Sequence, residues 1–179
     1  MGQLVISPFS GLILLYSATW SFWFSQTPSE ALVISFCAAF PLIWLSKTDL
    51  ARYEIPDSAS LGLACIGIGS AAVLQPENVL IHLMSGLLVF GLAWLFGEVF
   101  FRWRGIEGLG IGDAKLLGAG ICLLGPAQLP DLLLLSSLGG IFLCMTQYFR
   151  KSGGSAGIPF GPFIAYAVFI LVLQPSFIF

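Results

Sequence analysis

Apolar runs separated by short polar or glycine- and proline-rich breaks constrain the fold of this chain more than any other feature. A helix needs about 20 apolar residues to cross the hydrocarbon core of a bilayer, and several of the runs reach that length. Charged residues make up only 9% of the sequence, against about 25% in soluble domains. The sequence therefore predicts an all-α, polytopic transmembrane helix bundle embedded in a lipid bilayer. The runs cover about 4–24, 31–47, 58–75, 79–101, 114–125, 131–149 and 158–174.

The expected number of membrane segments is seven, or six if the fifth does not span. The fifth run, 114–125, is short, and it crosses only if it includes flanking residues or lies buried among neighbouring helices. No Lys or Arg precedes the first run, so we expect a retained transmembrane helix there rather than a signal peptide. The length of 179 residues fits a single membrane-embedded domain over 1–179, with no separate soluble domain.

The basic residues predict the orientation of the bundle. All seven Lys and Arg residues lie in alternate loops, whereas the intervening loops 25–30, 75–78 and 125–131 carry only the acidic residues Glu30, Glu77 and Asp131. Cytoplasmic loops of membrane proteins are enriched in Lys and Arg. We therefore expect a cytoplasmic amino terminus and an outer carboxyl terminus. The basic residues are Lys47, Arg52, Arg102, Arg104, Lys115, Arg150 and Lys151.

Charge and cysteine content exclude several classes of function. Seven basic against nine acidic residues leave no basic face for nucleic acid. The cysteines Cys37, Cys65, Cys122 and Cys144 lie in apolar runs without a C-x-x-C pair, so neither a disulfide framework nor a zinc site is indicated. We expect no metal and no other cofactor. The only histidine, His82, falls near the outer side and is expected to be a packing or interfacial residue.

Two aspartates, Asp49 and Asp113, are candidate catalytic residues. The pattern of basic residues predicts that both lie at the cytoplasmic surface. Asp49 ends the second run, where no N-cap is needed and where the helix dipole disfavours a carboxylate. Asp113 follows alternating glycines, among them Gly110 and Gly112, which permit unusual backbone conformations and close approach of another chain. Position alone also allows a simpler role for Asp113, as the N-cap of a helix that begins at Ala114.

Four neighbouring features also need an interpretation, and two of them have two. Asp57 precedes the third run and is expected to be its N-cap. Lys115 lies two residues after Asp113 and should point away from it on a helix, in an orienting or snorkelling role. The prolines and glycine of 158–163 either begin a helix or shape an unwound entrance for an extended peptide. Glu98 either turns into the bundle or reaches the boundary near Arg102.

With these residues identified, the chain resembles the type IV prepilin peptidases, which are A24-type GxGD membrane aspartyl proteases. The resemblance covers 48–57, 107–117 and 159–163, in the order of the family. It implies that Asp49 and Asp113 are the catalytic pair and that Asp57 belongs to the first motif without being catalytic. The residues that support the motifs are then Gly110, Gly112, Lys115, Pro159 and Gly161.

The resemblance also implies a substrate and a location. Members of this family act in the bacterial inner membrane and cut pilin-like precursors at its cytoplasmic face, after the glycine that ends a basic leader. Bifunctional members carry paired C-x-x-C motifs and also methylate the new amino terminus. This sequence has no such motif, so we expect a short form, similar to those that serve tight-adherence pili or pseudopilins, with peptidase and without methyltransferase activity. No oligomeric state follows from the sequence.

The expected chemistry is activation of water by two carboxylates. Two nearby carboxylates do not both ionise readily, so one holds a proton and polarises the scissile carbonyl while the other takes a proton from the attacking water. Neither a covalent intermediate nor a metal is required. Three alternatives stay open at this point: an intramembrane protease of the presenilin or signal-peptide-peptidase kind, a small proton-coupled transporter, and a non-catalytic subunit of a secretion or pilus machine.

Overall fold

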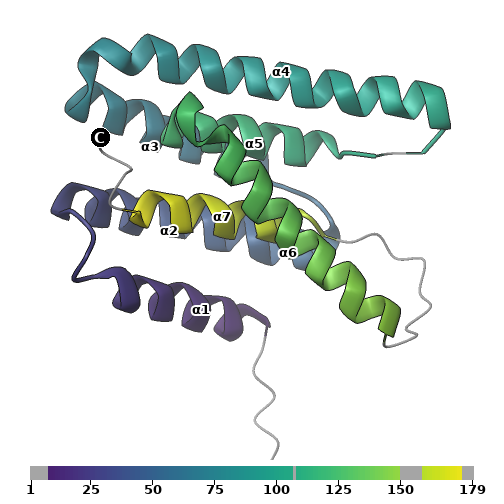
Figure 1. Cartoon of the computed structure of the whole chain (residues 1–179), viewed down its shortest axis with the longest axis horizontal. Helices are drawn as coiled ribbons and strands as arrows, with labels where there is room; N and C mark the ends of the chain where they lie inside the picture. Colours follow the sequence, from purple (N-terminus) through teal and green to yellow (C-terminus); the bar gives the residue numbers. More distant parts are fainter. Residues whose placement is uncertain (1–7, 107, 150–158, 175–179) are drawn as a thin grey trace, which may run out of the picture.

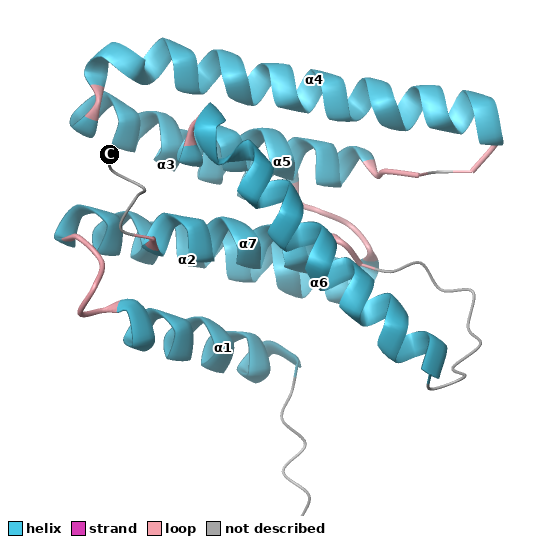
Figure 2. Cartoon of the chain, viewed as in Figure 1, coloured by secondary structure: helices cyan, strands magenta, loops and turns pink. Residues whose placement is uncertain are grey.

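A computed structural model describes residues 8–106, 108–149 and 159–174, and these residues form helices joined by short connections (Figures 1 and 2). No strand occurs within these ranges, so the predicted all-α class is confirmed. Two 3-10 turns, η1 (Pro76–Asn78) and η2 (Pro126–Gln128), precede the fourth and sixth helices. The α-helices are α1 (Pro8–Trp23), α2 (Ser29–Arg52), α3 (Asp57–Leu74), α4 (Val79–Arg104), α5 (Ile111–Leu124), α6 (Leu129–Phe149) and α7 (Gly161–Leu173).

Three helices extend beyond the apolar runs that predicted them. The second and fourth continue past 47 and 101 to Arg52 and Arg104, and the fifth begins at Ile111 rather than at 114. Hydropathy marks only the apolar part of a helix, whereas backbone hydrogen bonding continues through the polar residues at its end. The starts of the first and last predicted segments, together with Arg150 and Lys151, lie outside the described residues.

The two shortest helices form the centre of the bundle. Every residue of α5 from Leu116 to Leu124 is buried, and α7 buries most of its length. α5 packs against α3, α4 and α7, while α7 packs against α2 and α6. In Figure 1, α4 and α1 lie at opposite edges of the molecule and α6 crosses obliquely over the middle. The longer helices therefore enclose a core made by the shorter ones.

Four of the described helices are long and apolar enough to cross a membrane, which agrees with a multi-pass membrane protein. With their flanking turns they span Ser29–Arg52, Asp57–Leu74, Pro76–Arg104 and Pro126–Thr146. Large apolar side chains such as Phe36, Phe40 and Phe142 are exposed on them, as expected for surfaces that contact lipid. α5 has 14 residues, about 21 Å at 1.5 Å per residue, so a full crossing by α5 stays a prediction.

Glycines allow α5 to approach its neighbours at backbone distance. A Cβ atom added to Gly67 of α3 would lie 2.6 Å from the backbone of Leu123, and one added to Gly86 of α4 would lie 2.8 Å from the carbonyl oxygen of Gly118. Small residues serve the same purpose at helix interfaces in membranes generally. The central helix is thus fixed in position by contacts that larger side chains do not permit.

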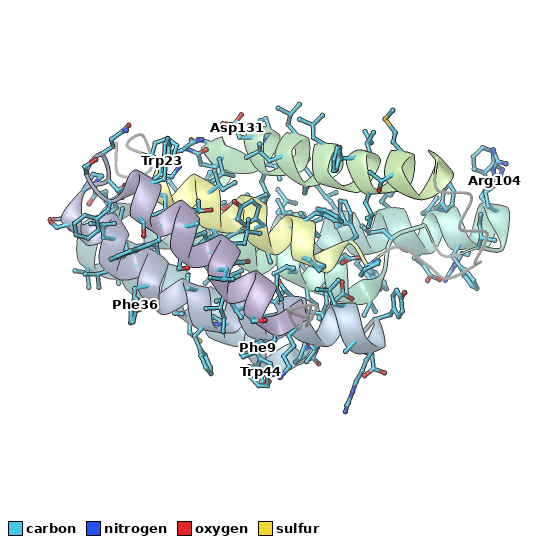
Figure 3. All side chains as sticks on the ribbon, turned by 90° about the horizontal axis from the view of Figure 1, so that it is seen from below. Phe9, Trp23, Phe36, Trp44, Arg104 and Asp131 are labelled. Atoms are coloured by element: carbon cyan, nitrogen blue, oxygen red, sulfur yellow. The ribbon has the colours of Figure 1, made fainter. Side chains whose placement is uncertain are left out.

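Several helix termini meet at one end of the bundle. The connections from α2 to α3 and from α4 to α5 lie there, and α7 begins there, at the right of Figure 1. Figure 3 shows Arg104 at this end, while Trp23 and Asp131 lie toward the other. The residues predicted for the catalytic site all belong to these connections and to the first or last turns beside them.

Candidate active site

Asp49 lies in the last turn of α2 and is held by the start of α7. Tyr53 ends α2 in the left-handed region, with φ 56°, and its N–H donates to the main-chain oxygen of Asp49 at 2.9 Å. The backbone N–H of Gly161 donates to Asp49 Oδ2 at 3.0 Å, and Asp49 is only 5% exposed. Hydrogen bonds to an ionised carboxylate are among the stronger ones in proteins. The carboxylate of Asp49 therefore has a fixed position in a largely buried setting.

Asp113 lies in the first turn of α5, and the alternative role that position allowed it, as the N-cap, is not observed. Gly110 is the N-cap, because its carbonyl accepts the first helical hydrogen bond, from Ala114 N–H at 3.1 Å. The backbone of Gly110 lies beside the side chain of Asp113 and favours its charged form, which lowers the pKa of that carboxyl. A carboxylate that reaches back to the N-cap in this way is favoured by the positive end of the helix dipole. Asp113 thus faces the loop before α5.

The two aspartates line one cavity of about 470 Å³. Its wall comes from the end of α2, the loop to α3, and the start of α5. Glu54 and Asp57 also line it, so four carboxylates meet a single basic side chain, Lys115. Asp49 and Asp113 are far apart in the chain, and the fold brings them together through the contacts of α7 with α2 and α5.

The two carboxylates influence each other electrostatically. Asp113 precedes the apolar run of α5, and its pKa is raised to about 6. Burial, which disfavours the charged form, is the main cause, and the negative charge of Asp49 adds to it, whereas the backbone of Gly110 acts in the opposite direction.

Gly161 leaves the space that Asp49 needs, and Gly112 leaves space for Ile55 beside the cavity. A Cβ atom on Gly161 would lie 2.7 Å from Asp49 Oδ2, and one on Gly112 would lie 3.0 Å from Ile55 Cβ. Both distances are closer than side chains ordinarily allow. A Cβ atom on Gly110 would lie 3.4 Å from the carboxylate of Asp113, an ordinary contact. Gly161 and Gly112 are therefore required by packing, and Gly110 is not required by packing alone.

Asp57 and Lys115 form an ion pair between helices. Lys115 Nζ lies 2.6 Å from Asp57 Oδ1, with the side chains 33% and 67% exposed. The sequence predicts that Asp57 is the N-cap of α3, and this is wrong, because Asp57 is the first residue of the helix. The N-cap is Pro56, whose carbonyl accepts hydrogen bonds from the N–H groups of Ala59 and Ser60. The Asp57 side chain is thus available to Lys115. The pair links the starts of α3 and α5 beside the cavity.

The remaining predicted residues occupy simpler positions. Pro159 lies just before α7, which begins at Gly161 in a helix-start arrangement. Glu98 pairs with Arg102 at 2.7 Å on the surface of α4. His82 hydrogen bonds to the carbonyl oxygen of Cys122 at 3.0 Å, near the far end of α5. Within the described ranges, no group of three or more His, Cys, Asp or Glu side chains is placed to hold a metal ion.

Two contributions to the site are not predicted by the sequence pattern. The local sequence predicts that Gly161 begins or opens a helix, and the resemblance includes it in a motif, but neither predicts that its N–H binds the carboxylate of Asp49. Glu54 lines the cavity although nothing in its local sequence distinguishes it from an exposed loop residue. One signal in the sequence indicates the ion pair of Asp57 and Lys115. The two residues have opposite charges and lie near the starts of two helices at the same end of the bundle.

Comparison with known proteins agrees with the geometry. Residues 34–145 match the model of the type IV leader peptidase family. The chain is 33% identical over 158 residues to a prepilin leader peptidase/N-methyltransferase of Legionella pneumophila, covering 85% of this chain and 52% of the relative. A protein of the same name from Aeromonas salmonicida is 35% identical, covering 82% of this chain and 51% of the relative. One from Escherichia coli K12 is 31% identical, with 79% and 62% covered.

The lengths differ, because the chain spans about half the length of the first of these relatives. No solved structure gives a significant match. The matched region includes both aspartates of the cavity and the whole of α3, α4 and α5.

Proposed function

Because this chain belongs to the type IV leader peptidase family, we propose that it is a prepilin-type aspartic peptidase whose catalytic pair is Asp49 and Asp113. The observation that carries the proposal is the shared cavity, in which one buried carboxylate is hydrogen bonded to Gly161 and the pKa of the other is raised to about 6. Carboxyl pairs with one proton between them activate water in aspartic proteases.

In the proposed reaction, water attacks the scissile carbonyl between the two carboxyl groups. The ionised aspartate takes a proton from the water, and the protonated one donates a hydrogen bond to the carbonyl oxygen. The tetrahedral intermediate then collapses, the peptide C–N bond breaks, and the leaving amine receives a proton from the pair. We assign Asp49 to the ionised state, because the Gly161 N–H stabilises a charge there, and Asp113 to the protonated state. The pair titrates as a unit.

The proposed substrate is the leader of a pilin-like precursor. The cavity carries the carboxylates of Asp49, Glu54, Asp57 and Asp113, and its one ammonium group, on Lys115, is already paired with Asp57. Such a surface complements a basic segment. The relatives are named prepilin leader peptidases, which supports the same substrate class for this chain.

The proposed location of the site is the cytoplasmic face of the bacterial inner membrane. Of the basic residues in the described ranges, Arg52, Arg102, Arg104 and Lys115 lie at or near helix ends on the side of the bundle that carries the cavity. The positive-inside rule then places this end in the cytoplasm, the amino terminus with it, and the carboxyl terminus outside.

Cleavage of a precursor by the purified protein tests the proposal. The protein is placed in vesicles of bacterial phospholipid with a full-length pilin-like precursor, and the product is identified by amino-terminal sequencing. We expect one new amino terminus at the junction of the basic leader and the hydrophobic segment. An intact precursor, under conditions where the protein is folded, contradicts the proposal. Adding S-adenosylmethionine to the same reaction tests the prediction that the new amino terminus stays unmethylated.

A further inference from the structure

An apolar groove lies on the other side of the ion pair from the catalytic cavity. It has a volume of about 310 Å³ and runs between α3, α4 and α5. Leu61 and Ala64 of α3 face Leu87 and Phe90 of α4 across it, with α5 as the floor. Its lining is almost entirely apolar. The mechanism proposed above does not use it.

The groove is continuous with the catalytic cavity. Asp57 and Lys115 line both spaces, and their side chains are partly exposed. A peptide that leaves the cavity on this side therefore passes the ion pair and enters the groove directly. The two spaces differ sharply in character, since the cavity is rich in carboxylates and the groove is apolar.

The floor of the groove is rigid. Gly86 of α4 and Gly118 of α5 both line it, and a Cβ atom on Gly118 would lie 2.8 Å from the carbonyl oxygen of Gly86. The two helices are thus in backbone contact and leave little room for closure. The edges are open, because Leu61 is 65% and Leu87 is 53% exposed. The groove therefore opens sideways toward the bilayer.

One polar atom in the groove lacks a partner. Ser60, one turn after Asp57, is 5% exposed, and its hydroxyl oxygen has no hydrogen-bond partner among the described residues. A buried hydroxyl without a partner is costly. The oxygen is covered by its neighbours, so it meets an occupant of the groove only when the serine side chain rotates. A peptide backbone then offers carbonyl oxygens as acceptors, whereas a lipid chain offers none.

We propose that this groove binds the start of the hydrophobic segment that follows the cleaved bond of the precursor. The inference rests on the proposed function and adds where the substrate helix lies: its polar leader in the acidic cavity, its apolar segment in the groove, and the cleaved bond beside the aspartates. Hydrolysis adds one water, leaving a carboxylate on the leader and an ammonium group on the segment. Asp57, at the mouth of the groove, provides a carboxylate close to that new charge.

Two adjacent leucines of α4 allow a matched test. Leu87 lines the groove, while Leu88 is exposed to 62% on a neighbouring face and lies outside it. A photo-crosslinking phenylalanine analogue is placed at either position in the full chain, which is irradiated in phospholipid vesicles with a tagged precursor. We expect a strong adduct with the hydrophobic segment of the precursor from position 87 and a weak one from position 88. Equal adducts, or adducts at 87 only with lipid or with a second copy of the chain, overturn the proposal.

A second pair of variants tests the groove by filling it. Ala64→Phe places a ring in the groove, and Ala72→Phe places the same ring on an exposed face of α3. Ala64→Phe should lower kcat/KM for the precursor about tenfold relative to Ala72→Phe, as for the loss of one well-buried apolar contact, and should remove the adduct at 87. Equal cleavage by both variants, or an undiminished adduct at 87, overturns the proposal.

The wild-type chain separates this inference from the proposed function. If it leaves the precursor uncleaved, the proposed function fails. If it cleaves the precursor while positions 87 and 88 crosslink alike, only the groove is refuted.

Discussion

Replacing Gly161 with alanine is the sharpest steric test of the site. The new methyl group would lie 2.7 Å from Asp49 Oδ2, 3.1 Å from its Cγ and 3.0 Å from Ile55 Cδ1. A carbon and an oxygen without a bond ordinarily stay farther apart than the first distance. The carboxylate therefore has to move away from α7, and the hydrogen bond from the Gly161 N–H, now 3.0 Å long, is stretched or lost.

The size of the effect follows from that displacement. A hydrogen bond to a charged group contributes about 1.5–3 kcal/mol. Misplacing a catalytic group by about 1 Å costs about 100-fold in rate. We expect Gly161→Ala to lower kcat/KM for precursor cleavage by about 10- to 100-fold. The loss should appear mainly in kcat, because the carboxylate acts on the reacting atoms.

Gly91→Ala provides the matched control. Gly91 lies within α4, and a Cβ atom there meets nothing within 4 Å. The same exchange should preserve cleavage and stabilise the helix by about 0.5–1 kcal/mol. Both variants are assayed in vesicles with one precursor, and their thermal unfolding is compared. Wild-type kcat/KM in a folded Gly161→Ala protein refutes the account of how Asp49 is held.

Three further predictions concern the rest of the site. The pKa of Asp113 is about 6, so the carboxyl keeps its proton below that pH and loses it above. We therefore expect kcat to fall as the pH rises through about 6. A kcat that stays constant from about pH 5 to about pH 8 contradicts this. Asp57→Asn and Lys115→Gln should each change the free energy of unfolding by less than about 1 kcal/mol, since the ion pair is partly exposed. A much larger loss of stability contradicts a partly exposed ion pair at this position. Asp57→Asn should also retain substantial cleavage. Gly112→Ala should slow cleavage, because the new Cβ atom would lie 3.0 Å from Ile55 Cβ beside the cavity. Cleavage at the wild-type rate contradicts this.

The helical class and the polar ends of the bundle are predictable from sequence because both depend on local composition. The run of apolar residues predicts each helix, and the alternation of basic loops predicts which ends lie together. The exact starts of α3 and α5 are not predictable in this way. Asp57 and Asp113 both look like N-caps, yet Pro56 and Gly110 take that position, because backbone hydrogen bonding begins one or more residues before the apolar run.

Contacts between distant segments account for what the sequence does not predict. The N–H of Gly161 reaches Asp49 across 112 positions of the chain, and Lys115 reaches Asp57 across 58. Neither contact can be predicted from the periodicity or the local composition of the sequence. The burial of α5 is similar: its short length suggests a weak membrane segment, whereas the packing of α3, α4 and α7 around it makes it the centre of the bundle.

Cleavage by carboxamide variants tests the central proposal most directly. Asp49→Asn and Asp113→Asn keep the size of each side chain and remove its acid–base function. Each should lower kcat for a full-length precursor by about 10²- to 10⁴-fold, with the unfolding midpoint near that of the wild type. Glu98→Gln, which alters only a surface pair with Arg102, should cleave normally. Wild-type cleavage by either folded aspartate variant contradicts the proposal that these two carboxylates activate the water.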